Sequence, residues 1–234
     1  MIQEIRIKNY LSFRDEVVLS FEATKDTTFE ECQVVNVTPK VRLLRFALIY
    51  GANASGKSNL LKAMDFLRDF WFDKKSDIDE DTGVVPFLLD TETPNEPSEF
   101  NIKFFVGDKR YWYALVLDDK QVIKEDLYVY NSVQPSLVFS RELDGTASLI
   151  KLNASLVKAN ATIVEQLNVK CLSNMSFFAA RNQVNCSLAY IDEVRDWMKN
   201  NMMPIIEPGT RMFEYAGKQM EKNAELKAYI LDFV

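Results

Sequence analysis

A run of eight residues carries the spacing that binds the phosphates of a nucleotide. It reads Gly-x4-Gly-Lys-Ser and comprises Gly51, Ala52, Asn53, Ala54, Ser55, Gly56, Lys57 and Ser58. The two glycines let the backbone curl so that successive N–H groups point inward, toward an anion. Lys57 supplies a mobile ammonium for the β- and γ-phosphates, and Ser58 supplies a hydroxyl ligand for Mg²⁺. The pattern predicts a site for ATP with Mg²⁺.

The sequence lacks the residues that other common catalytic chemistries require. The chain contains no histidine, which removes the usual general base, the Ser–His and Cys–His nucleophile pairs, and histidine-ligated metals. Cys32, Cys171 and Cys186 are widely spaced and form neither a zinc pattern nor a disulfide framework. Phosphate chemistry remains the natural candidate, because positioning and electrostatics do most of its work.

Charge and hydropathy narrow the class of protein further. The net charge is −6 and no basic run occurs, so the surface is not expected to coat nucleic acid. No apolar run approaches the ~18 residues that a membrane span needs, and the N-terminus lacks a signal peptide's basic and apolar regions. We therefore expect no membrane association. Together with the cysteine pattern, this favours a cytoplasmic location.

A strand and a helix are expected to position the phosphate loop. Residues 46–50 form a continuous apolar run that ends at Gly51, which predicts a strand buried on both faces. After Ser58, apolar residues recur at helical spacing and predict a helix that packs against a sheet. This stripe comprises Leu60, Met64, Leu67 and Trp71, widened by Leu61 and Phe70.

Alternating apolar residues predict further strands. Two short strands, one around Ile5 and Ile7 and one over 17–21, flank a loop at 9–14. Residues 73–98 are acidic and contain three prolines, which predicts an irregular connection. An antiparallel meander is then expected, unlike the parallel sheet expected around the phosphate loop. Its strands cover about 100–106, 111–117 and 121–130, with a shorter pair around Asp144-Gly145.

The chain from about residue 152 is predicted to be mostly helical. Residues 175–180 interrupt this region and are predicted as a strand, and a helix is expected around Leu188 to Met198. The last segment, 221–234, shows an apolar helical face without a Gly or Asn cap at its end. We therefore expect the chain to be part of a longer protein. The residues of this face are Leu226, Tyr229, Ile230, Phe233 and Val234.

Two segments resemble a known family. Residues 5–15 read Ile-Arg-Ile-Lys-Asn-Tyr-Leu-Ser-Phe-Arg-Asp, and residues 51–59 read Gly-Ala-Asn-Ala-Ser-Gly-Lys-Ser-Asn. Together they look like the N-terminus of ABC-type ATPases of the SMC/RecF branch. Within that branch they are most similar to the abortive-infection and OLD-like ATPases of prokaryotic defence. The likeness is sharp over about 1–70 and looser to about 190.

The resemblance implies a fold and a division of the chain. The expected class is α/β, an ABC-ATPase-like P-loop lobe with a mixed sheet plus the antiparallel meander, followed by helices. The lobe should cover 1–187 and include an antiparallel β subdomain at about 99–151. The incomplete start of a helical lobe should cover 188–234.

The resemblance also implies roles for residues outside the loop. In that family the loop after the first strand lies against the nucleotide, which points to Ser12, and Asn59 extends the phosphate-binding motif. A glutamine between the two lobes contacts Mg²⁺ and the γ-phosphate, and Gln183 stands at a plausible place. The alternative interpretation, that Gln183 is an ordinary polar residue of a linker, has equal weight.

Several motifs of the family are missing from this chain. Residues 172–176 imitate its Leu-Ser-Gly-Gly-Gln signature poorly, and the switch histidine is absent. Residues 115–119 mimic a Walker B strand, but Asp118-Asp119-Lys120 is better interpreted as a hairpin turn. The catalytic carboxylates are therefore expected elsewhere, with Lys57 the catalytic residue present here. We expect this chain to bind ATP with negligible hydrolysis.

Three functions remain open at this point. The first is the ATP-binding lobe of an SMC/RecF/OLD-like ATPase. The resemblance then implies a homodimer of heads that sandwiches two ATP molecules and controls an effector, often a nuclease acting on DNA or RNA, in phage defence. The second is the nucleotide-binding subunit of a membrane transporter. The third is an interaction module gated by ATP without hydrolysis. Asn59 and the loop at 9–13 favour the first.

Overall fold

The computed structural model describes residues 1–207 and 209–232. The chain divides into two compact units, Met1–Met203 and Pro204–Val234. The predicted division at residue 188 into two lobes stays a prediction.

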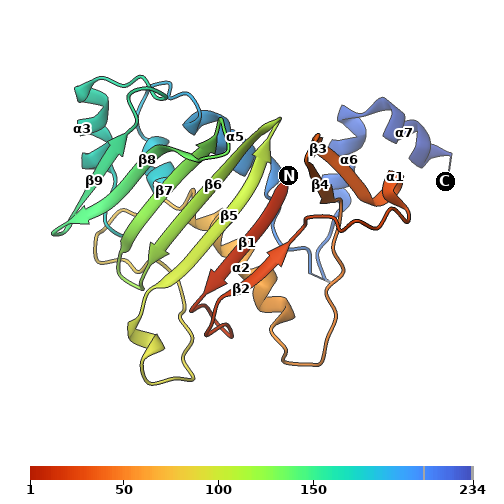
Figure 1. Ribbon diagram of the computed structural model, residues 1–234, viewed down its shortest axis with the longest axis horizontal. Helices are drawn as coiled ribbons and strands as arrows, with labels where there is room; N and C mark the ends of the chain where they lie inside the picture. Colours follow the sequence, from red (N-terminus) through yellow and green to blue (C-terminus); the bar gives the residue numbers. More distant parts are fainter. Residues whose placement is uncertain (208, 233–234) are drawn as a thin grey trace. The chain divides into compact units, whose positions relative to one another are not determined.

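One seven-stranded sheet forms the framework of the larger unit (Figure 1). Its order is β2-β1-β5-β6-β7-β8-β9, and every described pair of neighbouring strands is antiparallel. The α/β class is confirmed, but the expected mixed sheet is wrong for the part of the chain described. The strands are β1 (Ile2–Lys8), β2 (Val17–Ser20), β5 (Ser98–Val106), β6 (Lys109–Leu117), β7 (Val122–Tyr130), β8 (Ser136–Asp144) and β9 (Ala147–Leu152).

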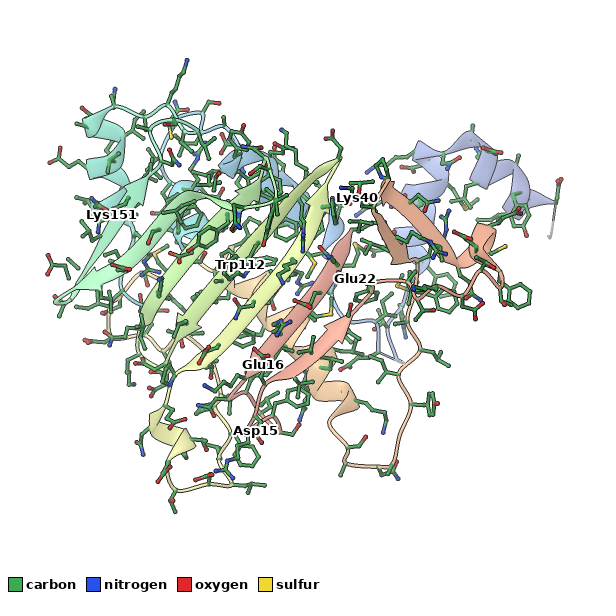
Figure 2. All side chains as sticks on the ribbon, in the orientation of Figure 1. Asp15, Glu16, Glu22, Lys40, Trp112 and Lys151 are labelled. Carbon is green, nitrogen blue, oxygen red and sulfur yellow. The ribbon has the colours of Figure 1, made fainter. Side chains whose placement is uncertain are left out.

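Period-two alternation explains the meander, whose prediction is confirmed. In β5 and β6, Ile102 lies opposite Tyr113 and Phe104 lies opposite Tyr111, and all four side chains are fully buried. Burial of one such side chain contributes about 1.5–3 kcal/mol. Trp112, between two of them, points to the other face of the sheet, which faces the viewer in Figure 2.

Two helices pack on the buried face of the sheet. The first, α2 (Lys57–Phe70), is followed by Trp71, whose ring meets Tyr113 edge-on at 5.5 Å. The second, α5 (Ile191–Asn201), stacks Trp197 on Phe104 at 4.4 Å. Both predicted helices are thus confirmed.

The predicted apolar stripe of α2 is largely correct. The residues that α2 buries are Leu60, Ala63, Leu67 and Phe70. Met64 is only partly buried, whereas Leu61 is exposed and does not widen the stripe as predicted.

The strand predicted at residues 46–50 is wrong. A short helix and a two-stranded hairpin precede this segment: α1 (Glu30–Gln33), β3 (Val34–Thr38) and β4 (Val41–Leu44). Residues 46–50 have no regular structure and belong to neither described sheet. A strand needs a neighbour for its backbone N–H and C=O groups, and none lies beside this run. Leu48 and Tyr50 are accordingly 81% and 88% exposed.

The strand predicted at residues 175–180 is also wrong. After α3 (Ala161–Lys170), the chain forms the short helix α4 (Phe177–Arg181). The side chain of Ser176 caps this helix by accepting from Phe178 N, and Glu125 Oε2 accepts from Phe177 N at 2.7 Å. All five helical residues are buried. A continuous apolar run does not distinguish a buried strand from a buried helix.

The irregular connection at 73–98 is confirmed as predicted, apart from a 3-10 turn, η1 (Thr93–Asn95), and the start of β5 at its end. No helix in the described part of the chain is long and apolar enough to cross a membrane.

The described residues of the second unit include two helices, α6 (Phe213–Lys222) and α7 (Ala224–Leu231). Asn223 caps α7, because its Oδ1 accepts from Leu226 N at 3.0 Å. Tyr229 and Ile230 of the predicted apolar face lie in α7, whereas Phe233 and Val234 lie outside the described residues.

Candidate nucleotide site

The loop at 51–56 leads directly into the N-terminus of α2. Gly56 is the N-cap residue, with φ of 88°, and its position provides no side-chain cap. Lys57 and Ser58 follow in the first turn, where backbone N–H groups have no intrahelical acceptor. These donors lie at the positive end of the helix dipole, which makes the first turn a site for an anion.

Gly56 is required for two reasons. Its positive φ disfavours any residue with a Cβ. A Cβ at this position would also lie 3.0 Å from Phe13 Cε1 and 3.0 Å from Ser12 Oγ. The phosphate loop and the β1–β2 loop therefore touch at Gly56. Gly51 is closely packed as well, because a Cβ there would lie 3.1 Å from Ser55 Oγ.

The side chain of Lys57 folds over the loop. Its Nζ donates to Gly51 O at 2.9 Å, to Ala52 O at 2.6 Å and to Ser55 Oγ at 3.3 Å. An ammonium has three donors, so these oxygens engage all of them. The positive charge is thus already located at the loop. The oxygens of a bound phosphate can replace the loop oxygens as hydrogen-bond acceptors of Lys57 Nζ.

The β1–β2 loop lies against the first turns of α2. Ser12 Oγ accepts from Asn59 Nδ2 at 2.9 Å. Tyr10 and Phe13 pair through two backbone hydrogen bonds of 2.9 Å, and Tyr10 Oη donates to Lys62 O at 3.3 Å. Burial, and secondarily the charge of Asp65, raises the pKa of Tyr10 to about 12. The structure thus brings Ser12 and Asn59 together beside Gly56, and their contact with a nucleotide stays a prediction.

Gln183 lies at a cavity outside the phosphate loop. It follows α4 and lines a cavity of about 670 Å³ together with residues of α3 such as Gln166 and Lys170. None of the described residues that line this cavity belongs to the phosphate loop. A contact of Gln183 with Mg²⁺ stays a prediction to which this arrangement adds no support.

Asp118 and Asp119 form the turn between β6 and β7, as predicted. Asp118 Oδ1 accepts from the backbone N–H groups of Lys120 and Gln121, both at 2.8 Å. This is the local bonding by which aspartate stabilises a turn. The hairpin interpretation of the Walker B-like run is therefore confirmed.

Two residues next to the site were not predicted. Phe13 fills the space above Gly56, and Asn9 is buried at the end of β1 with φ of 51°. Asparagine tolerates positive φ better than most residues, so an Asn directly after a strand was the available signal for Asn9. The family resemblance points to the loop after the first strand, but no residue spacing indicates that Phe13 packs on Gly56.

The described residues fit a polyphosphate with a cation. The loop has no Cβ at Gly56, the first turn of α2 places the positive end of the helix dipole beside the loop, and Lys57 provides a positive charge. Ser58 adds a hydroxyl of the kind that accompanies Mg²⁺ in such sites. These features are those of a P-loop nucleoside triphosphatase.

Comparison with known proteins agrees with this class. Residues 46–151 match the family described as "AAA domain, putative AbiEii toxin, Type IV TA system". This is an ABC/SMC-like P-loop ATPase family linked to abortive infection, so the resemblance seen in the sequence is confirmed. The match includes the phosphate loop, α2 and the meander through most of β9. None of the curated proteins matches the chain.

Proposed function

We propose that the chain binds ATP with Mg²⁺ at residues 51–58, as the ATP-binding part of an ABC/SMC/RecF-like ATPase. The contact of Lys57 Nζ with Gly51 O and Ala52 O carries this proposal, because it holds the charge over the loop at the start of α2. The family match over 46–151 supports it.

Each side chain of the site has a distinct role in this proposal. Lys57 binds the β- and γ-phosphates, and the N–H groups of the first turn bind phosphate oxygens. Ser58 holds Mg²⁺, which, when bound, neutralises phosphate charge. Ser12 and Asn59 contact the nucleotide from the β1–β2 side. Gln183 reaches Mg²⁺ only if its segment lies beside the loop in the bound state.

We further propose that the full-length protein hydrolyses ATP, whereas this chain alone does so negligibly. The sequence has no signature motif and no histidine, and its Walker B-like run forms a hairpin turn. By resemblance, two heads of the full-length protein form a homodimer around ATP. A nuclease or DNA partner and a role in phage defence follow from the same resemblance.

Titration with ATP, with and without Mg²⁺, tests the site. The wild-type chain is expected to bind ATP more tightly when Mg²⁺ is present. Ser58→Ala should remove most of this gain and leave Mg²⁺-free binding unchanged, since alanine suits the first turn of a helix. An unchanged gain in Ser58→Ala would contradict the assignment of Ser58.

A turnover assay on the same samples tests the expected lack of hydrolysis. Slow or undetectable turnover with tight binding agrees with the proposal. Turnover typical of ATPases, abolished by Lys57→Ala, would show that the chain already holds the catalytic carboxylate.

A further inference from the structure

Asn9 connects the end of β1 to a segment that follows much later in the chain. Its Nδ2 donates to Thr93 O and Glu96 O, both at 2.8 Å, and its Oδ1 accepts from Phe87 N at 2.9 Å. The Asn9 backbone oxygen accepts from Ser98 Oγ, and the residue is 1% exposed. One buried side chain thus fixes the connection at 85–98 (the outer connection).

The β1–β2 loop holds the outer connection at a second point. Leu11 N donates to Val85 O at 2.9 Å, and Leu11 also has a positive φ, of 49°. Asp15 and Glu16, labelled in Figure 2, mark the position where this loop returns toward β2. Residues 9 and 11 therefore both bond the outer connection.

The same loop touches the phosphate loop directly after Leu11. Ser12 and Phe13 lie 3.0 Å from the position that a Cβ of Gly56 would occupy, and Ser12 also bonds Asn59. The contact has no room for a Cβ at Gly56. A shift of residues 9–11 would therefore change how Ser12 and Phe13 lie against Gly56 and Asn59.

We propose that Asn9 is a positioning residue for the nucleotide site, and that it couples the outer connection to nucleotide binding. This inference rests on the proposed function, since it assumes that residues 51–58 bind ATP. Asn9 acts through Ser12 and Phe13. Because coupling between two sites is reciprocal, bound nucleotide stabilises the outer connection as much as an ordered connection favours binding.

Amide hydrogen exchange on the wild-type chain tests the coupling without a mutation. ATP is expected to slow exchange at the N–H of Leu11, which donates to Val85 O, and at the N–H of Phe87, which donates to Asn9 Oδ1. Exchange at the N–H of Ile150, which donates to Asn168 Oδ1 from β9 at the opposite edge of the sheet, is expected to stay the same. Unchanged exchange at Leu11 and Phe87 with ATP bound would overturn the inference.

Asn9→Asp tests the residue itself. Aspartate keeps the size, the tolerance of positive φ and the acceptor, but it places an oxygen against the carbonyls of Thr93 and Glu96. ATP affinity is expected to fall by about fivefold or more, the lower end of the range for coupled sites. The protection of Phe87 by ATP should fall with it.

Asn174→Asp is the matched control. Asn174 is also fully buried, and its Nδ2 donates to Asp77 O and Glu80 O, both at 2.8 Å. It fixes an earlier part of the irregular connection. The control should lower the free energy of unfolding in a similar way while leaving ATP affinity unchanged at temperatures where both variants are folded.

The possible failures are distinguishable. Absence of ATP binding to the wild-type chain contradicts the proposed function itself. If the wild-type chain binds ATP and Asn9→Asp binds it equally tightly, the proposed function stands and the inference about Asn9 is overturned. An equal loss of affinity in Asn174→Asp overturns it too, because general destabilisation would then explain the effect.

Discussion

Ser12 Oγ accepts a hydrogen bond from Asn59 Nδ2 at 2.9 Å, although the two residues are 47 positions apart. The bond joins the β1–β2 loop to the first turn of α2, directly beside Gly56. The phosphate loop is therefore supported on one side by a loop that belongs to the seven-stranded sheet. Changes in either loop are expected to affect the other.

Gly56→Ala should destabilise the protein and weaken ATP binding. The new Cβ meets Phe13 and Ser12 at 3.0 Å, and φ of 88° is unfavourable for alanine. Strain and overpacking together are expected to lower the free energy of unfolding by about 2–4 kcal/mol. Urea denaturation and ATP titration measure the two effects.

Gly83→Ala separates the backbone strain of a positive φ from the overpacking against neighbouring side chains. Gly83 has φ of 85°, but a Cβ there would meet no atom within 4 Å. Its cost should be limited to about 1–2 kcal/mol of backbone strain, without loss of ATP affinity. Equal losses of stability in both variants would show that the contact with Phe13 and Ser12 contributes nothing.

Glu125→Gln should be strongly destabilising. Glu125 and Arg141 are fully buried and their side chains pair at 3.2 Å, while Glu125 also accepts from Tyr113 Oη and Ser176 Oγ. Removing the carboxylate leaves the Arg141 charge buried without compensation, which costs about 3–5 kcal/mol. The free energy of unfolding from urea denaturation measures the loss.

Asp81→Asn is the control for this prediction. Asp81 pairs with Lys120 at 2.6 Å, but both side chains are about two-thirds exposed. Solvent screens such a pair, so the free energy of unfolding should not change measurably. A loss as large as that of Glu125→Gln would mean that burial does not set the cost.

The strength of each local pattern decided what could be predicted. Strict alternation in β5 and β6 predicted the meander, because only a half-buried strand gives that period. The apolar runs at 46–50 and 175–180 have no period. Whether they form strands depends on neighbours, namely a paired strand for the first and the caps at Ser176 and Glu125 for the second.

The residues of the candidate site also fall into those that the sequence predicts and those that it does not. The phosphate loop is local in sequence, so its residues and spacing were readable directly. The role of Asn9 depends on hydrogen-bond partners that lie 78 to 89 positions away in the sequence. The role of Phe13 depends on its packing against Gly56. Long-range contacts of this kind leave no mark in the spacing of residues.

Tyr10→Phe should reduce the loss of stability at alkaline pH. Burial raises the pKa of Tyr10 from 10.0 to about 12, so the folded state keeps the phenol neutral where the unfolded state ionises it. This contribution is complete below pH 10 and is lost as the pH rises to about 12. It amounts to about 2–3 kcal/mol.

Urea denaturation of both proteins at several pH values checks this prediction. The wild-type protein should lose more stability than Tyr10→Phe between pH 10 and about 12. Tyr111 and Tyr113, whose pKa values burial also raises, should leave some alkaline sensitivity in the variant. Identical pH profiles would contradict the placement of the Tyr10 ring against α2.

Direct titration of ATP into the wild-type chain, Lys57→Ala and Lys62→Ala tests the central claim most directly. Lys57 donates to the phosphate loop, whereas Lys62 lies further along α2 with an exposed side chain. Lys57→Ala removes a charge-assisted bond of about 1.5–3 kcal/mol, so its dissociation constant should rise about ten- to a hundredfold. Lys62→Ala should match the wild-type chain. An unchanged dissociation constant in Lys57→Ala would contradict the assignment of this loop as the nucleotide site.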